Sequence, residues 1–349
     1  MTRILILKTG ALGDVLRTTS ILPGLTARYP GARITWVTAP GAVDLIRLHP
    51  LIQTIVTLDV DAPGDIAAKA KSLGETRWDH VISLDDEEAL CKFASSLPAR
   101  RLSGAYLRDD GARAYTSDVA PWFDMGLLSV LGKEVADRMK VENGRSHAAI
   151  LADMLGIAIG RPELVIEPES DRFAADFARR TKLRERGAVV GLNTGAGGRW
   201  HSKALTPERT VQLAVAIDRA LEGRVVFALF GGLGESERNA RIAALLAREV
   251  ASVDAGVDNR LLDFAALVGL CDVLITSDSL ALHIGLARGV RTVAFFAPTS
   301  AAEIELFGLG EKIVSTAPDY CSYKPDADTS TLTPERISAA VLRQLAARG

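Results

Sequence analysis

Short apolar runs recur along the chain and alternate with longer stretches that have the residue spacing of helices. The runs are rich in Val and Ile, nearly continuous and bounded by turn residues, which is typical of parallel strands buried on both faces of a sheet. They cover residues 4–7, 34–38, 54–58, 80–84 and 102–106 in the first half, and residues 188–192, 224–230, 251–254, 272–276, 292–296 and 312–315 in the second. The alternation predicts an α/β protein with two parallel sheets.

Helices are predicted between these strands, over residues 12–28, 64–73, 88–95, 146–155, 170–184, 207–221 and 235–248. Thr206 and Thr333 are each followed by Pro, Glu and Arg. A threonine in this setting caps the first turn with its side-chain oxygen, and the proline suits the first helical position, where no N–H is needed. We therefore expect helices to begin just after both threonines.

The length of 349 residues fits two domains of ordinary size. Residues 160–170 (GRPELVIEPES) interrupt two helical patterns with glycine, prolines and extended residues. We place the boundary there, with a first domain over 1–165, a second over 166–332 and a final helix over 333–349. Residues 108–141 break the strand–helix rhythm of the first domain, as inserted binding loops often do.

The charges are balanced and evenly spread, since 41 Lys and Arg against 43 Asp and Glu give a net charge of −2. A dedicated nucleic-acid binder needs a basic excess to neutralise phosphates, so we expect no nucleic-acid partner. The three cysteines form no CxxC or Cys/His cluster, which argues against a disulfide framework and a zinc site. No apolar stretch approaches the length of a membrane span or signal peptide. We expect a soluble, cytoplasmic protein without a metal.

The first predicted strand runs directly into KTGALGDVLR, from Lys8 to Arg17. Asp14 falls at the start of the following helix, beyond the carboxyl edge of the sheet, where open α/β folds bind ligands. From the spacing alone, an acid that only stabilises the helix dipole is an equally good interpretation. The turn is not GxGxxG and the chain contains no GxxxxGK[ST], which argues against a nicotinamide dehydrogenase and a P-loop NTPase.

A glycine-rich turn follows the first predicted strand of the second domain, in the sequence NTGAGGRWHSK. The backbone N–H groups around Thr194, Gly195 and Gly197 can form a concavity that binds phosphate, and Arg199 and Lys203 add cations nearby. These features favour a phosphate site over a plain surface loop.

Two further turns fall at the same edge of the predicted sheet. FGGLGE ends at Glu235, which opens a helix, and TSDSLALH places Asp278 or Ser279 at a helix N-cap with His283 one turn later. The free N–H groups of such a helix can bind a diphosphate, whereas a plain N-cap accounts for only one of the two residues. A single histidine in this position is more often structural than catalytic.

Five motifs in this order together resemble the heptosyltransferase family, glycosyltransferase family 9, whose members build lipopolysaccharide core and related glycans. They are KTGALGDVL, NTGAGGRWHSKALTPER, FGGLGESER, SDSLALH and FAPTSAAEIELFG, and they span nearly the whole chain. The resemblance implies a GT-B fold, in which two Rossmann-like domains face each other across a cleft. Residues 1–165 would bind the acceptor and residues 166–332 the nucleotide sugar, and the helix over 333–349 would return to the first domain.

The resemblance also implies roles for individual residues. Asp14 matches the acid taken as catalytic base, and Lys203 matches a lysine near the donor phosphate and sugar. Glu235 matches the acid that holds the nucleotide ribose. The remaining donor-binding candidates are Thr194, Gly195, Gly197, Arg199, Asp278, Ser279 and His283. Lys8, Arg17, Arg108 and Arg113 are the acceptor-binding candidates, although for the arginines of the 108–141 insertion a solvated face is the slightly favoured interpretation.

Three positions depart from the family pattern. Leu280 stands where the family has a glycine beside the phosphates, and Leu205 and Thr206 stand in a lysine motif that otherwise reads KxWP. The expected reaction is an inverting, metal-independent transfer of a heptose from ADP-heptose onto a lipopolysaccharide-core or related glycan, with no cofactor besides this co-substrate. A UDP- or GDP-linked hexose donor, and a catalytically idle homologue that binds sugar nucleotides, are the alternatives. With balanced charge, contact with the inner face of the cytoplasmic membrane should be at most transient.

Overall fold

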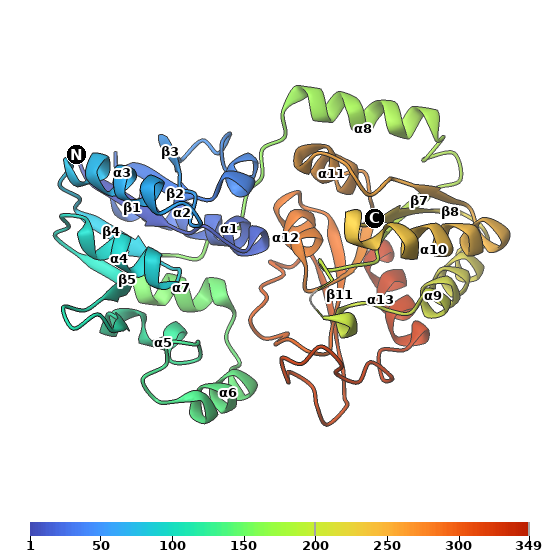
Figure 1. Ribbon diagram of the computed structural model, residues 1–349. Helices are drawn as coiled ribbons and strands as arrows, with labels where there is room; N and C mark the ends of the chain where they lie inside the picture. Colours follow the sequence, from blue (N-terminus) through green and yellow to red (C-terminus); the bar gives the residue numbers. More distant parts are fainter. Residues whose placement is uncertain (199, 348–349) are drawn as a thin grey trace. The chain divides into compact units, whose positions relative to one another are not determined.

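The computed structural model describes residues 1–198 and 200–347, and its chain divides into two compact units. The first unit comprises Met1–Val165 and Ala302–Glu305, and the second comprises Ile166–Ala301 and Leu306–Gly349. Each unit is built on one six-stranded sheet with helices packed on it (Figure 1). Both units are α/β structures, as the sequence pattern predicts.

The sheet of the first unit has the order β3-β2-β1-β4-β5-β6. Its strands are β1 (Arg3–Leu7), β2 (Arg33–Thr38), β3 (Thr54–Thr57), β4 (His80–Ser83), β5 (Leu102–Leu107) and β6 (Arg113–Tyr115). The first five are parallel, as expected, but β6 pairs antiparallel with β5 across a hairpin. The predicted parallel sheet is thus present, and β6 is an antiparallel addition that was not predicted because its three residues are too few to give a recognisable apolar run.

Helices of the first unit pack on this sheet, although not all of them reach it (Figure 1). Its helices are α1 (Leu12–Thr18), α2 (Leu22–Arg28), α3 (Pro63–Gly74), α4 (Glu88–Ser96), α5 (Ala120–Phe123), α6 (Lys133–Glu142) and α7 (His147–Leu155). The expected single helix over 12–28 is divided by a 3₁₀ turn at Thr19–Ile21. Pro23 follows this turn and has no N–H to continue an α-helical hydrogen-bond pattern, which accounts for the break.

The sheet of the second unit is wholly parallel, with the order β12-β11-β10-β7-β8-β9. Its strands are β7 (Ala188–Asn193), β8 (Val225–Phe230), β9 (Ser252–Asp254), β10 (Val273–Ser277), β11 (Arg291–Phe296) and β12 (Gly310–Val314). Its helices are α8 (Pro168–Arg180), α9 (Pro207–Ala220), α10 (Ser236–Glu249), α11 (Leu261–Val268), α12 (Leu280–Ala287) and α13 (Pro334–Ala346). All six strands therefore end at the same edge of the sheet.

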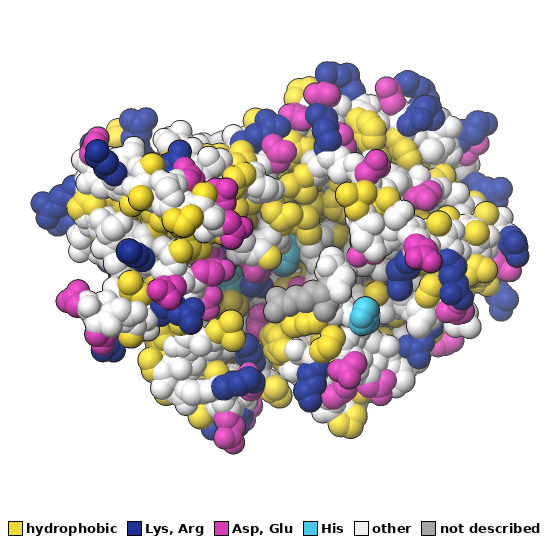
Figure 2. All heavy atoms as spheres, viewed as in Figure 1, with side chains coloured by type: hydrophobic (Ala, Val, Ile, Leu, Met, Phe, Trp, Pro, Cys, Tyr) yellow, Lys and Arg dark blue, Asp and Glu magenta, His cyan; other side chains and the backbone are white. Residues whose placement is uncertain are grey.

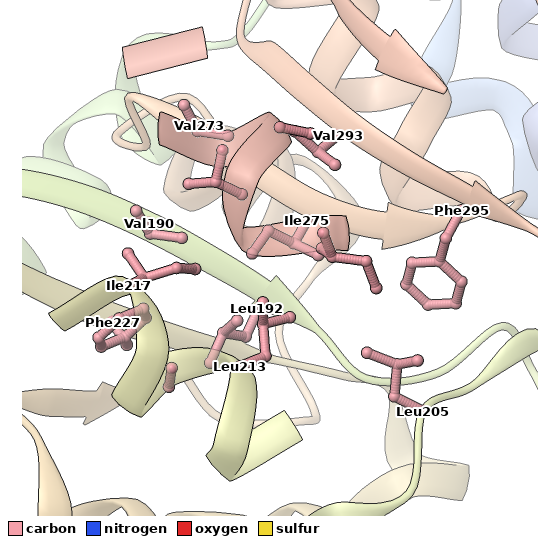
Figure 3. Close-up of a cluster of buried hydrophobic side chains, with 14 of the residues drawn as sticks. Val190, Leu192, Leu205, Leu213, Ile217, Phe227, Val273, Ile275, Val293 and Phe295 are labelled. Atoms are coloured by element: carbon pink, nitrogen blue, oxygen red, sulfur yellow. The ribbon is translucent and has the colours of Figure 1, made fainter. Parts of the chain in front are cut away.

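Buried aliphatic and aromatic side chains join this sheet to the helices α9 and α13 (Figure 3). Leu192, Phe227 and Ile275 point from the strands toward Leu213 and Ile217 of α9, and all five are at most 2% exposed. Burial of one such side chain contributes about 1.5–3 kcal/mol. This core fixes the strand ends, and with them the loops that carry the donor-site candidates.

The final helix, α13, packs within the second unit. Its side chains Ile337, Ala340 and Val341 are fully buried in the same cluster, and the helix lies against α9 and β11. Residues spaced i, i+3 and i+4 form one apolar face, and here that face covers the second sheet. This placement differs from the expectation that the helix over 333–349 returns to the first domain.

Both threonine caps that the sequence predicts are present. The Thr206 hydroxyl oxygen accepts a hydrogen bond from the backbone N–H of Arg209 at 3.2 Å, and α9 begins at the following proline. Thr333 caps α13 in the same way, through the N–H of Arg336.

Candidate functional site

The donor-site candidates of the second unit lie on loops at one edge of its sheet. Because β7, β8 and β10 are parallel and hydrogen-bonded in the order β10-β7-β8, their carboxyl ends meet there. The loop after β7 carries residues 194–203, the loop after β8 ends at Glu235, and β10 leads into Asp278 and Ser279. The arrangement is the one in which open α/β sheets bind ligands.

Gly195 and Glu235 are in direct contact. A Cβ atom at Gly195 would lie 2.2 Å from both the carboxyl carbon and Oε1 of Glu235, so a larger residue would force the Glu235 side chain or the loop to shift. The Glu235 side chain is buried, and its Oε2 accepts a hydrogen bond from the backbone N–H of Gly232 at 2.8 Å. The structure thus brings together two candidates that are 40 residues apart in the chain.

In the remainder of the glycine-rich loop, Thr194 is held by hydrogen bonds, whereas Gly197 and Gly198 have open space beside them. The hydroxyl of Thr194 is buried and lies within hydrogen-bonding distance of Phe230 O and of Asn239 Oδ1, so it joins neighbouring elements. Gly197 and Gly198 have φ values of +76° and +71°, a conformation that side-chain-bearing residues rarely adopt. Arg199 lies outside the described residues.

Asn193, the last residue of β7, connects this loop to the turn after β10. Its Nδ2 lies 2.8 Å from Gly195 O, 3.1 Å from Thr276 Oγ1 and 3.3 Å from Ser279 Oγ. Asn193 was not among the predicted site residues. The available signal was a polar amide at the end of an otherwise apolar strand, which is where a loop-bracing side chain is needed.

Lys203 and Asp278 form an ion pair. The Lys203 ammonium donates to the Asp278 carboxylate Oδ2 at 3.0 Å and to its backbone oxygen at 2.8 Å. The same ammonium lies 5.1 Å from the ring centre of Trp200, a cation–π contact. Both charged side chains retain about a fifth of their exposure, so a ligand can reach them.

The turn before α12 is not capped as the sequence suggested. Asp278 is engaged by Lys203, and Ser279 occupies the N-cap position but directs its hydroxyl to Thr276 Oγ1 at 2.9 Å. The Ser279 side chain accepts no hydrogen bond from the first turn of α12. Ser279 therefore stands at the predicted N-cap position, but its side chain does not cap the helix.

His283 and Leu280 lie on α12 itself. His283 is buried, at 6% exposure. Leu280 is the first residue of the helix and is half-buried, at the position where the family pattern has glycine.

The first unit places Lys8 against Asp85 at the carboxyl ends of β1 and β4. Lys8 Nζ donates to Asp85 Oδ1 at 2.5 Å, and the backbone N–H and hydroxyl of Thr9 donate to Oδ2 at 2.5 and 2.9 Å. Burial raises the pKa of the Asp85 carboxyl, and the Lys8 charge and the Thr9 donors oppose that shift. Lys8 was expected to contact the acceptor, yet in this structure its charge holds a buried carboxylate.

Asp14, Arg17 and Trp122 form a chain of contacts near the start of α1. Arg17 Nη2 lies 2.8 Å from Asp14 Oδ1, and the Arg17 guanidinium lies 5.6 Å from the ring centre of Trp122. The Trp122 ring in turn meets His147 edge to face, with centroids 4.6 Å apart. The Asp14 side chain is 36% exposed, so its carboxylate is held by an arginine and still open to solvent.

Arg113 and Arg108 lie on the β5–β6 hairpin. Arg113 Nη1 donates to the backbone oxygen of Asp86 at 2.8 Å, next to the Lys8–Asp85 pair. Arg108 forms an ion pair with Asp110 and is exposed. The hairpin therefore brings Arg113 to the strand ends of this unit, whereas Arg108 is on its solvated side.

Residues 1–198 and 200–347, which the structure describes, contain neither a metal-binding cluster nor a helix that could span a membrane. No group of three or more His, Cys, Asp or Glu side chains there is placed to hold a metal ion. In the same residues, every helix is too short or too polar to cross a membrane.

No protein-family model matches the sequence, and no curated protein matches it. Solved structures do match its fold. The chain aligns over 99% of its length with 98% of a glycosyl transferase family 9 protein from Veillonella parvula, at 21% identity and a TM-score of 0.80. It aligns over 100% of its length with 99% of ADP-heptose lps heptosyltransferase II from E. coli, at 18% identity and a TM-score of 0.68.

A third solved structure, E. coli heptosyltransferase WaaC with ADP, is similar over 98% of this chain and 97% of that chain, at 15% identity and a TM-score of 0.61. At these identities the likeness establishes the fold. The chain has the two Rossmann-like units of the GT-B fold, which confirms the predicted fold class.

Proposed function

We propose that the protein is an inverting glycosyltransferase that moves a heptose from ADP-heptose onto a lipopolysaccharide-core or related glycan acceptor. The observation that carries this proposal is the Lys203–Asp278 pair at the start of α12, beside the loop in which Gly195 contacts Glu235. This edge of the second sheet offers a cation and the N-terminus of a helix, both of which can bind a diphosphate.

In the proposed reaction, an acceptor hydroxyl oxygen forms a bond to the anomeric carbon of the donor sugar. The bond between that carbon and the diphosphate oxygen breaks, and its electron pair leaves with the nucleoside diphosphate. The hydroxyl proton passes to the Asp14 carboxylate, which is open to solvent and positioned by Arg17. Attack opposite the leaving group inverts the anomeric configuration.

Charge that develops on the leaving diphosphate would be met by Lys203. An ammonium has three N–H donors, and two of them are given to Asp278, so the third is available to a phosphate oxygen. Lys203 and the N–H groups of α12 and of residues 195–198 would together stabilise this charge without a metal ion or other cofactor. Buried Glu235 would present its carboxylate to the ribose.

Arg17, Arg113 and Arg108 are the proposed contacts to an anionic acceptor, with Lys8 fixing the strand ends behind them. Basic and acidic side chains are interspersed on the face drawn in Figure 2. A surface of mixed charge suits transient contact with the inner face of the cytoplasmic membrane, where a lipid-linked acceptor would be met. The site of action is therefore proposed to be cytoplasmic.

The donor is supported by likeness to the two E. coli heptosyltransferases, and a panel of nucleotides tests it. Thermal unfolding is followed with ADP-, UDP-, GDP- and dTDP-linked sugars, because a ligand at 100 times its Kd stabilises the folded state by about 2.7 kcal/mol. Stabilisation by ADP-heptose alone supports the proposal. Stabilisation by a UDP- or GDP-hexose alone would show that this sugar nucleotide, and not ADP-heptose, is the donor. No response to any of them contradicts a transferase.

The Asp14→Asn variant tests the base. It should bind donor as the wild type does, with transfer reduced by about 10²–10⁴-fold, as is typical when a general base is removed. Transfer at the wild-type rate would show that Asp14 is not the base. Donor binding without transfer in the wild type, for every acceptor offered, favours the idle sugar-nucleotide-binding homologue, for which Leu280 at the start of α12 is the structural argument.

A further inference from the structure

The segment over residues 320–325, between β12 and α13, has an unusual backbone. Cys321 and Tyr323 have φ values of +62° and +54°, in the left-handed region that residues with side chains seldom occupy. Such conformations persist only where the surrounding structure fixes them, and they gather near functional sites. The functional-site candidates do not account for this segment.

One side of the segment is attached to the loop that follows β11. The backbone N–H of Cys321 donates to Ala297 O, and that of Tyr323 donates to Pro298 O, both at 2.8 Å. Strands β11 and β10 are hydrogen-bonded neighbours, so this loop begins beside the turn that carries Asp278.

The other side of the segment supports the loop that carries Lys203. The backbone N–H of Ser202 donates to Pro325 O at 3.0 Å. The Tyr323 and Trp200 rings meet edge to face, with centroids 5.9 Å apart and an angle of 84° between their planes. The Lys203 ammonium lies over that same Trp200 ring.

These contacts form a continuous path from the left-handed segment to the ammonium. A lysine side chain has four rotatable carbon–carbon bonds and is poorly positioned unless neighbours hold it. The Trp200 ring restricts Lys203 without accepting one of its N–H donors, which keeps a donor for a ligand. A Trp200 ring that changed its orientation would no longer restrict Lys203. Tyr323 is the aromatic neighbour that packs against the Trp200 ring and limits such movement.

We propose that Tyr323 is a positioning residue for Lys203: its ring holds Trp200, and Trp200 together with Asp278 holds the ammonium where a leaving diphosphate would meet it. The inference rests on the proposed function for the identity of the ligand, whereas the packing between Tyr323 and Lys203 stands independently of it.

A double-mutant cycle tests this path. Tyr323→Ala should lower kcat for sugar transfer by at least about tenfold, with a smaller change in the KM for the donor, because the displaced ammonium acts on the transition state. Tyr323→Phe retains the ring and should keep most of the activity. In the Lys203→Ala background, Tyr323→Ala should have almost no further effect on kcat. If Tyr323→Ala does not fold, Tyr323→Leu takes its place.

The cycle also defines contrary outcomes. Independent, multiplicative losses in the double variant would overturn the proposal, since they would show that Tyr323 does not act through Lys203. An equal loss in Tyr323→Phe would overturn it as well, because the ring contact would not be the cause. Equal losses of thermal stability and activity across all variants would assign Tyr323 a structural role only.

A second measurement separates this inference from the proposed function. The indole N–H resonance of Trp200, assigned with Trp200→Phe, is recorded in the absence of any ligand. Tyr323→Ala should shift or broaden it, and Tyr323→Phe should leave it near the wild-type position. An unchanged resonance in Tyr323→Ala overturns the positioning role. If the wild type binds no nucleoside diphosphate and the resonance still responds, the proposed function fails while the packing path holds.

Discussion

Gly195 lies against the carboxyl group of Glu235 so closely that a Cβ atom would come within 2.2 Å of its carboxyl carbon. The carboxylate is fixed from its other side by the backbone N–H of Gly232. A buried glutamate and a glycine loop thus define each other's position, although the two belong to different strand-to-helix turns. This contact locates the part of the loop that a nucleotide would meet.

Gly195→Ala should therefore displace Glu235 or the loop. Overpacking of this kind costs about 1–3 kcal/mol of unfolding free energy, and nucleotide binding should weaken with it. The matched control is Gly234→Ala, one residue before Glu235, where an added Cβ meets open space and φ is not positive. Urea unfolding and ADP titration of both variants check the prediction. Equal behaviour of the two alanines would mean that the Gly195–Glu235 contact is not restrictive.

Lys203→Ala should reduce sugar transfer by about 10²–10³-fold in kcat, the effect typical of losing one group that stabilises developing charge. Folding should be little affected, because the pair with Asp278 is partly exposed and such pairs contribute about 0–1 kcal/mol. Lys133→Ala removes an exposed lysine that is paired with Asp137 on α6 and is the control. The kcat of Lys203→Ala is measured by steady-state kinetics with saturating donor. A kcat within threefold of the wild-type value would show that Lys203 does not take part in the mechanism.

The sequence predicted those features that depend on local pattern. The buried parallel strands are visible as runs of Val and Ile, and Thr206 and Thr333 cap their helices because a cap is set by the adjacent residues. Strand β6 escaped prediction because three residues carry too little pattern. The sheet on which α13 packs could not be predicted, because the apolar face of this helix could cover either sheet. Only the tertiary structure shows that it packs on the second one.

Site residues followed the same rule. Lys203 and Asp278 lie at one edge of the second sheet because they follow neighbouring parallel strands, and the alternation of strands and helices in the sequence predicts this. Asn193 and Asp85 act through contacts with residues far away in the chain, so the adjacent sequence does not identify their partners. Asp278 looked like a helix cap because the sequence around it gives no sign of the lysine that engages it.

Asp85→Ala should destabilise the first unit strongly. The carboxylate is almost inaccessible and accepts hydrogen bonds from the Lys8 ammonium and twice from Thr9. Removal of one partner from a buried pair leaves the other charge uncompensated and costs about 3–5 kcal/mol. Asp86→Asn is the matched control, because Arg113 binds the backbone oxygen of Asp86 and not its side chain. Chemical denaturation of both variants measures the difference, and similar midpoints would contradict the assigned role of Asp85.

His80 should make the folded state sensitive to acid. Its Nε2 lies 2.8 Å from the hydroxyl oxygen of Ser103, which itself donates to Asp118, so the neutral Nε2–H tautomer satisfies the network. Burial, with a smaller effect of Arg101, lowers the pKa of His80 from 6.5 to about 4. Protonation would place a hydrogen on Nδ1, for which the described residues provide no acceptor.

The sign of the effect follows from this lowered pKa. Between pH 6.5 and about 4 the unfolded chain binds a proton at His80 and the folded chain does not, so the free energy of unfolding should fall as the pH falls through this window. The loss should approach about 3 kcal/mol at the acid end. Urea unfolding at pH 7, 5.5 and 4.5 measures it, and His80→Asn should flatten the slope. Burial also lowers the pKa of His49, so this histidine serves as the comparison. His49→Gln should reduce the pH dependence of the unfolding free energy by less than His80→Asn does. A slope that His80→Asn leaves unchanged would show that other groups govern the acid sensitivity.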